Sequence, residues 1–206
     1  MDSDVLDNAQ ARQIVAKSVE PIAHALIKLK ITPDAVTWAG ALGTVGISLG
    51  LLSQGHLLVG GILIALLSAS DLLDGTMARL QGSQGAWGAF LDSTLDRVSD
   101  ASVICAIIYY YSQSGQEHSQ SAVSAGLVSL VMGLLTSYAR ARAEGLGVDC
   151  KVGIAERAER SIILLTALIL TGLGLNVLPY GLILLAVVST ITVGQRMWHV
   201  RRLLAS

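Results

Sequence analysis

Six long apolar stretches constrain this chain more than any other feature of its sequence. A helix needs about 20 consecutive, mostly apolar residues to cross the hydrocarbon core of a membrane. Only 14% of the 206 residues are charged, whereas an ordinary soluble domain has about 25%. The predicted spans are residues 34–53, 57–77, 90–111, 122–138, 161–175 and 178–196. The sequence therefore predicts an all-α integral membrane protein with six transmembrane helices.

The lysines and arginines divide the predicted connections into two sets. Basic residues collect in the cytoplasmic loops of membrane proteins. All fourteen lie before the first span, around the second connection, in or beside the fourth, or at the end of the sixth span. The first, third and fifth connections, near residues 53–56, 112–120 and 174–179, contain none. This alternation predicts a multi-pass protein of the cytoplasmic membrane, with both termini on the cytoplasmic side.

The segment before the first span has a weaker, amphipathic pattern. Within residues 8–30, apolar side chains recur at helical spacing, and these are Val15, Val19, Ile22, Leu26 and Leu29. Polar residues occupy another face, so the pattern predicts an N-terminal amphipathic helix in the membrane interface. An ordinary surface helix packed on the bundle fits the same spacing.

The start of the first span and the domain organisation follow from local signals. Thr32 and Pro33 are typical of an N-cap and a first helical residue, so the first span is predicted to begin there. The sequence contains no internal repeat and no linker. We therefore expect one membrane domain over residues 1–206, with a juxtamembrane helix at 8–30 and a six-helix bundle at 33–202.

An acidic segment interrupts the apolar pattern between residues 70 and 100. Asp71 and Asp74 lie near the cytoplasmic end of the second span, and Asp92 and Asp96 near the start of the third. At 3.6 residues per turn each pair falls on one side of its helix, and a helical hairpin would bring the two pairs together. An ionised carboxylate at the membrane centre costs about 2.5–3.5 kcal/mol. The group therefore requires positive charge close by.

A hard divalent metal is the cation that best fits facing carboxylates from two helices. Magnesium, manganese and calcium ions all prefer oxygen ligands. Gly75 and Ala78 share a helix face with the first carboxylate pair, and such small residues leave room for a flat ligand. We predict metals at the floor of a cavity with space for a nucleotide. On charge and spacing alone, an ion-pair network or the proton carriers of an ion-coupled transporter are alternatives.

The complete spacing of this segment resembles the signature of the CDP-alcohol phosphotransferase family. All the specified positions match, and they are Asp71, Asp74, Gly75, Ala78, Arg79, Gly88, Asp92 and Asp96. The resemblance implies a six-span membrane enzyme, usually a homodimer, that transfers a phosphatidyl-type group from a CDP-linked lipid to an alcohol and releases CMP. The resemblance makes the transporter alternative weaker. A transporter would also need polar residues toward the far side of the membrane, where Glu117 is the only acid.

The resemblance also implies a role for each matching residue. Asp71, Asp74 and Asp92 would hold two divalent ions, Mg²⁺ or Mn²⁺, while Asp96 would touch the metal site and act as the general base. The cytidine nucleotide would be bound by Asp71, Asp74, Gly75, Ala78, Arg79 and Gly88. These roles fit the reaction, because attack of a hydroxyl on a diphosphate needs charge neutralisation and a base for the proton.

A second basic region bears on the acceptor alcohol. Residues 138–160 contain several arginines, and a solvated cytoplasmic loop would explain part of this enrichment. Arginine is also suited to gripping phosphate through paired donors. The region therefore favours an acceptor that itself carries a phosphate.

Three segments in this half of the chain resemble the actinobacterial branch of the family that uses inositol 1-phosphate as acceptor. They are residues 138–144, residues 156–163 and the pair Gln195 and Arg196. In that branch basic residues hold the acceptor's phosphate, and the matching positions here are Arg140, Arg157 and Arg196. Arg140 stands where that branch has lysine, so the positive charge is retained.

Several alternatives remain open from the sequence. CDP-diacylglycerol and inositol 1-phosphate are the expected substrates, but phosphatidylglycerophosphate synthases share the metal signature and also take a phosphorylated acceptor. A donor with ether-linked chains fits the same residues. Asp100, one turn beyond Asp96, is expected to pair with a basic residue rather than bind metal. No alternation of aromatic and basic residues suggests nucleic acid as a partner.

Overall fold

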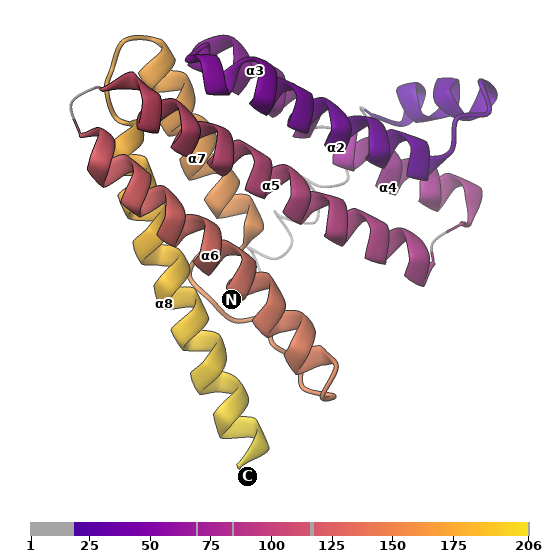
Figure 1. Ribbon diagram of the computed structural model, residues 1–206. Helices are drawn as coiled ribbons and strands as arrows, with labels where there is room; N and C mark the ends of the chain where they lie inside the picture. Colours follow the sequence, from indigo (N-terminus) through magenta and orange to yellow (C-terminus); the bar gives the residue numbers. More distant parts are fainter. Residues whose placement is uncertain (1–18, 69, 84, 116–117, 206) are drawn as a thin grey trace, which may run out of the picture. The chain divides into compact units, whose positions relative to one another are not determined.

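The computed structural model describes residues 19–68, 70–83, 85–115 and 118–205, and the regular elements in these ranges are all helices (Figure 1). The α-helices are α2 (Pro33–Gly50), α3 (Leu57–Ser68), α4 (Ser70–Gln81), α5 (Ala86–Ser114), α6 (Ser119–Glu144), α7 (Arg157–Gly172) and α8 (Leu178–Leu204). A short 3₁₀ turn, η1 (Leu52–Gln54), follows α2. The prediction of an all-α fold is confirmed.

Of the predicted interfacial helix at 8–30, only the last part falls within the described residues. Residues 19–28 are helical, and residues 8–18 lie outside the part that the structure describes. The predicted start of the first span is confirmed, because α2 begins at Pro33. The Thr32 hydroxyl caps this end by accepting a hydrogen bond from the Ala35 N–H at 3.2 Å.

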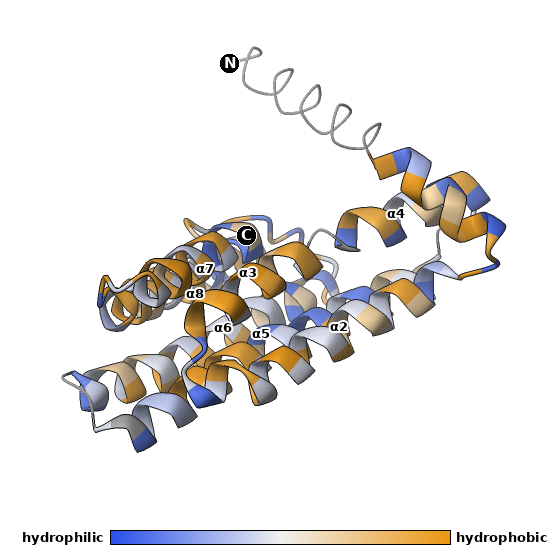
Figure 2. Ribbon diagram, turned by 90° about the horizontal axis from the view of Figure 1, so that it is seen from above, coloured by the Kyte–Doolittle hydropathy of each residue, from blue (hydrophilic) through white to orange (hydrophobic). Residues whose placement is uncertain are grey.

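Four described helical segments are long and apolar enough to cross a membrane. They are Pro33–Gln54, Leu57–Gln81, Ser119–Glu144 and Leu178–Leu204, and apolar residues predominate along α3 in Figure 2. They match the first, second, fourth and sixth predicted spans. The other two predictions fall on α5, whose first half carries the charged residues Asp92, Asp96, Arg97 and Asp100, and on α7, which has only 16 residues.

The described chain forms two compact units. The first contains the residues up to Val45 together with Ile64–Ser99, and the second contains Gly46–Leu63 together with the residues from Asp100 onward. In the first unit, Ala41 of α2 packs in a buried cluster with Leu91 and Leu95 of α5. This unit holds the whole acidic segment up to residue 99.

α4 ends in a tight turn at Gly82 and Ser83. Gly82 has a φ of +61°, in the left-handed region that glycine adopts without strain. Its N–H donates to the Arg79 carbonyl at 3.2 Å, and the Ser83 N–H donates to the Ala78 carbonyl at 3.0 Å. This pair of bonds is the Schellman arrangement that ends a helix. It ends α4 and lets α5 begin only a few residues later.

In the second unit, α8 packs against both α6 and α7. The Ser129 hydroxyl of α6 donates to the Leu182 carbonyl of α8 at 3.0 Å, in the buried contact between the two helices. The Thr171 hydroxyl at the end of α7 accepts from the Leu178 N–H at 2.8 Å and so caps the start of α8. The first contact holds α8 against α6, and the second ties its start to the end of α7.

Candidate active site

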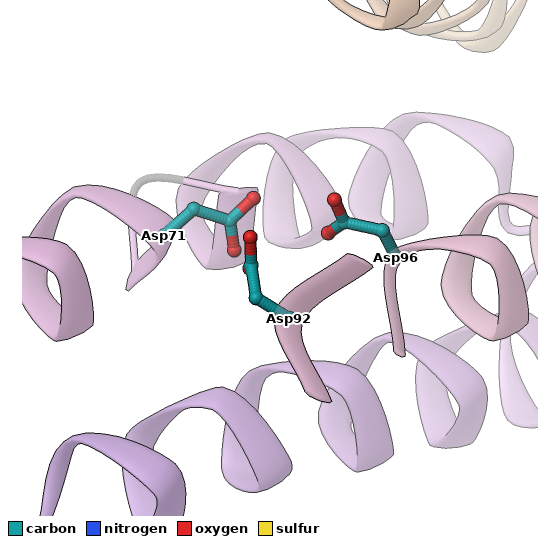
Figure 3. A group of neighbouring side chains, drawn as sticks. All are labelled: Asp71, Asp92 and Asp96. Carbon is teal, nitrogen blue, oxygen red and sulfur yellow. The ribbon is translucent and has the colours of Figure 1, made fainter. Parts of the chain in front are cut away.

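Three carboxylates converge in the first unit. Asp71 lies in the first turn of α4, while Asp92 and Asp96 lie one turn apart in α5, and the three side chains point toward one another (Figure 3). One oxygen of each lies within 4.8 Å of the other two, and all three residues are half-buried. The helical hairpin thus brings together residues that are 25 positions apart in the sequence.

This arrangement suits a divalent cation. Negative charges this close repel one another strongly when they are shielded from bulk water. A hard cation with oxygen ligands would remove that repulsion. The donor set fits Mg²⁺ or Mn²⁺, because both ions prefer carboxylate oxygens. The three residues are therefore a group that could hold a metal ion.

Asp74, the fourth predicted carboxylate, lies beside this group and is not one of its three members. It is only 7% exposed, and one of its carboxylate oxygens accepts a hydrogen bond of 2.6 Å from the Thr37 hydroxyl of α2. The negative charges of Asp92 and Asp71 both act on it. The Thr37 oxygen is 3.1 Å from the Pro33 carbonyl, so its single proton serves the closer carboxylate.

Sequence reasoning missed Thr37, and also the contact that ties the start of α2 to the start of α5. The indole N–H of Trp87 donates to the Asp34 carboxylate at 3.0 Å. Thr37 and Asp34 lie within the first turns of α2, directly after its cap. The only sequence signal for both residues is their position next to that helix start.

The predicted nucleotide-binding residues lie around the same hairpin. At Gly75 and Gly88, a Cβ would meet no atom within 4 Å among the described residues. Ala78 is half-buried and Arg79 is exposed, with an Arg79 guanidinium nitrogen donating to the Thr76 hydroxyl at 3.0 Å. The two glycines thus leave the helix backbone open to a ligand.

Arg97 is a basic residue that lies directly against the cluster. Its Nη1 donates to the Ser93 carbonyl at 2.7 Å and lies 3.4 Å from an Asp96 carboxylate oxygen. This cation offsets part of the negative charge of Asp96.

The predicted acceptor arginines lie in the second unit, and two of them form ion pairs at helix ends. Arg140, near the end of α6, bonds to Glu144 at 2.9 Å. Arg157 opens α7 and lies 3.8 Å from the Asp100 carboxylate, which is also 4.0 Å from Arg160. The expectation that Asp100 pairs with a basic residue is confirmed.

Arg196 of α8 is far more buried, with 3% of its surface exposed. Its Nε donates to the Val152 carbonyl at 2.9 Å and its Nη1 to the Thr136 carbonyl of α6. Its Nη2 lies 3.9 Å from a Glu156 carboxylate oxygen. The guanidinium therefore links three segments of the second unit.

Comparisons with known proteins agree on one family. The family model described as CDP-alcohol phosphatidyltransferase matches residues 30–193. Phosphatidylinositol phosphate synthase of Cutibacterium acnes is 43% identical over 196 residues, which cover 91% of this chain and 94% of the relative. The crystal structure of Mycobacterium tuberculosis phosphatidylinositol phosphate synthase with CDP-DAG bound has a TM-score of 0.84 at 36% identity, and covers 89% of this chain and 93% of that one. The same enzyme in complex with manganese and citrate also has a TM-score of 0.84 at 36% identity, covering 88% of each chain.

Proposed function

The chain belongs to the CDP-alcohol phosphatidyltransferase family, and we propose that it transfers the phosphatidyl group of CDP-diacylglycerol to inositol 1-phosphate, giving phosphatidylinositol phosphate and CMP. The observation that carries the proposal is the convergence of Asp71, Asp92 and Asp96 at the spacing of the family signature. Two further findings support the proposal: similar proteins are named as phosphatidylinositol phosphate synthases, and a similar crystal structure has CDP-DAG bound. Membership of an enzyme family also removes the transporter alternative.

We assign the metal site to the four aspartates. Asp71, Asp74 and Asp92 would hold two ions, Mg²⁺ or Mn²⁺, and Asp96 would touch the same site. When bound, the ions neutralise the charge that develops on the diphosphate oxygens. The Thr37 hydroxyl holds one Asp74 oxygen through its short hydrogen bond, and this fixes the rotation of that carboxylate. Metal ligands are commonly oriented by hydrogen bonds of this kind.

Asp96 is the proposed general base. It would accept the proton of the attacking hydroxyl as the new phosphodiester bond forms and the bond to CMP breaks. Arg97 lies 3.4 Å from its carboxylate, where its positive charge offsets part of the negative charge of the base.

The nucleotide-binding role belongs to the face of the hairpin that carries the small residues. Gly75 and Gly88 leave open space above the backbone, so a flat cytosine ring can approach the helices closely. Arg79, on the same helix as Asp71 and Asp74, would steady the phosphates of the donor. Its contact with Thr76 is a single hydrogen bond that it can exchange for a phosphate oxygen.

The acceptor's phosphate is assigned to the basic residues of the second unit. Arg140 and Arg157 would contact the phosphate directly, because both are partly exposed and guanidinium groups pair well with phosphate oxygens. Arg196 would add its positive charge from a buried position.

The topology proposed for the enzyme has six spans, as one membrane domain with both termini and the active site on the cytoplasmic side. α5 has 29 residues, which at 1.5 Å per residue is about 43 Å and exceeds the hydrocarbon thickness. α7 is shorter, and together with α5 it would cross among the four more apolar spans. A homodimer is the proposed assembly.

Release of CMP by the purified protein tests the reaction and its substrates. The assay uses CDP-diacylglycerol and Mg²⁺, with inositol 1-phosphate, glycerol 3-phosphate and free inositol as separate acceptors. Turnover with inositol 1-phosphate alone is the expected result. A preference for glycerol 3-phosphate would overturn the acceptor, and a parallel series with an ether-linked donor tests the lipid.

A further inference from the structure

The structure points to a second set of residues that serve the acceptor site without touching the substrate. We propose that Thr192 and Gln195 of α8 are positioning residues: they hold the connection between α6 and α7 in one conformation and thereby place Arg157 for the acceptor's phosphate. This inference rests on the proposed function, because it takes Arg157 as a phosphate-binding residue. Neither α8 residue belongs to the metal signature or to the predicted phosphate-binding arginines.

Two consecutive N–H groups of the connection bond to side chains of α8. The Ile154 N–H donates to the Gln195 side-chain carbonyl at 3.0 Å, and the Ala155 N–H donates to the Thr192 hydroxyl oxygen at 3.2 Å. Ile154 and Ala155 lie just before the first residue of α7, Arg157. The two bonds therefore fix the backbone immediately before the arginine.

The Thr192 hydroxyl both donates and accepts a hydrogen bond at this contact. It is completely buried, and its proton is donated to the Val188 carbonyl of its own helix at 2.8 Å. Its oxygen lone pairs remain available for the Ala155 N–H. A buried N–H that loses its acceptor costs considerably more than one that faces water, so the connection has a clear energetic preference for this conformation.

Gly153 shows that the connection also approaches α8 too closely for any other residue. Its φ of +138° is strained for a residue with a Cβ, and a Cβ there would collide with the Thr192 side chain. On the next residue toward the N-terminus, the Val152 carbonyl accepts from the buried Arg196. The connection is thus held against α8 by consecutive residues, through both donors and acceptors.

Arg157 is held from its other side by Asp100, whose carboxylate lies 3.8 Å away. An ion pair between two partly exposed groups is weak, so it does little to restrain the backbone. The hydrogen bonds from α8 restrain the backbone before α7, which the ion pair alone would not do. The Arg157 side chain can still contact a phosphate.

The test compares Thr192→Val and Gln195→Leu, alone and together, with Thr192→Ser, which keeps the acceptor oxygen. Gln195 borders an open hollow of about 450 Å³, so leucine fits without a clash. Loss of the buried bond from the Ala155 N–H to Thr192 corresponds to a factor of about 3–10, and loss of the exposed bond from the Ile154 N–H to Gln195 corresponds to less. We expect the KM for inositol 1-phosphate to rise by about that factor in Thr192→Val and by less in Gln195→Leu, with the KM for CDP-diacylglycerol and kcat unchanged, and Thr192→Ser to restore it. Met197→Ala, at an exposed neighbour on α8, is the matched control and should change nothing.

A second readout is independent of turnover. Cys150 is a completely buried residue of the same connection, so its thiol should react slowly with a maleimide, on a background in which the exposed Cys105 is replaced by serine. The double variant should label Cys150 faster than the parent protein. Equal changes in both KM values, or unchanged labelling and unchanged acceptor KM, would overturn the inference.

Arg157→Ala separates this inference from the proposed function. If Arg157→Ala raises the acceptor KM while the α8 variants do not, the positioning role is wrong and the phosphate assignment stands. If Arg157→Ala leaves the acceptor KM unchanged, the phosphate assignment itself fails, whatever the labelling of Cys150 shows.

Discussion

The carboxylate cluster and the arginine region hold opposite charges, and they are built in different ways. Asp71, Asp92 and Asp96 come from two consecutive helices joined by a tight turn, and helical spacing alone aligns them. The arginines come from three different helices, α6, α7 and α8, and each contacts an acid or a carbonyl of the protein. The first region is a local feature of the sequence, whereas the second depends on contacts between distant segments.

This difference predicts how each region responds to mutation. A change in the cluster should affect chemistry or metal binding directly, because its side chains face one another. A change in the arginine region should affect acceptor binding. Each single change should have a small effect, because several ion pairs and loop contacts contribute.

The largest expected effect comes from Asp96→Asn. An amide cannot accept the proton of the attacking hydroxyl, so turnover should fall by about 10²–10⁴-fold, while binding of CDP-diacylglycerol stays largely intact. CMP release by the purified variant measures turnover, and a separate binding assay measures its affinity for CDP-diacylglycerol. Asp149→Asn, at an exposed acid in the second unit, is the control. Equal loss of donor binding and rate would make Asp96 a ligand rather than a base.

A smaller effect is expected for Thr37→Val, which keeps the side-chain shape and removes the hydroxyl that donates to Asp74. Loss of a group that orients a metal ligand typically weakens metal affinity by about 10–100-fold. The Mg²⁺ concentration for half-maximal activity should rise accordingly, and Thr37→Ser should restore it. An unchanged Mg²⁺ dependence would show that Asp74 needs no such support.

Asp100→Asn should have a more modest effect, on the acceptor alone. The substitution removes the carboxylate shared by Arg157 and the buried Arg160, and the partly exposed ion pair with Arg157 contributes only about 0.2–1 kcal/mol. We expect the KM for inositol 1-phosphate to change by about fivefold or less, with the Mg²⁺ dependence unchanged. A shift in the Mg²⁺ dependence would mean that the two regions are coupled more tightly than the comparison implies.

The smallest expected effect is on Cys150, which reports the packing of the connection before α7. Burial raises the pKa of its thiol, and only the thiolate reacts with alkylating agents. Alkylation should therefore be slow at neutral pH and should accelerate only above the ordinary thiol range. Rapid labelling at neutral pH would show that the connection opens readily.

Much of the fold and of the candidate site is readable from the sequence. The apolar stretches predict the helices because length and hydropathy are local properties. The start of α2 follows from Thr32 and Pro33 for the same reason. Helical spacing nominated all four aspartates, because each pair falls on one side of its helix, and three of the four converge in the structure.

Contacts between distant segments could not be read in this way. Thr37 and Asp74 are 37 residues apart, and nothing in the spacing around either residue indicates their hydrogen bond. The burial of Arg196 against the Val152 and Thr136 carbonyls likewise has no sequence signal, because a lone arginine near a span end is equally typical of an exposed cytoplasmic residue.

The sequence by itself therefore determined the helical class, the family signature and the residues that could bind metal. Only the tertiary structure decided which polar groups they meet: Asp74 the Thr37 hydroxyl, Asp100 two arginines, and the connection before α7 the side chains of Thr192 and Gln195. The physical reason is that helical periodicity and hydropathy act between near neighbours in the chain. Hydrogen bonds and ion pairs, in contrast, form wherever packing brings a donor to an acceptor.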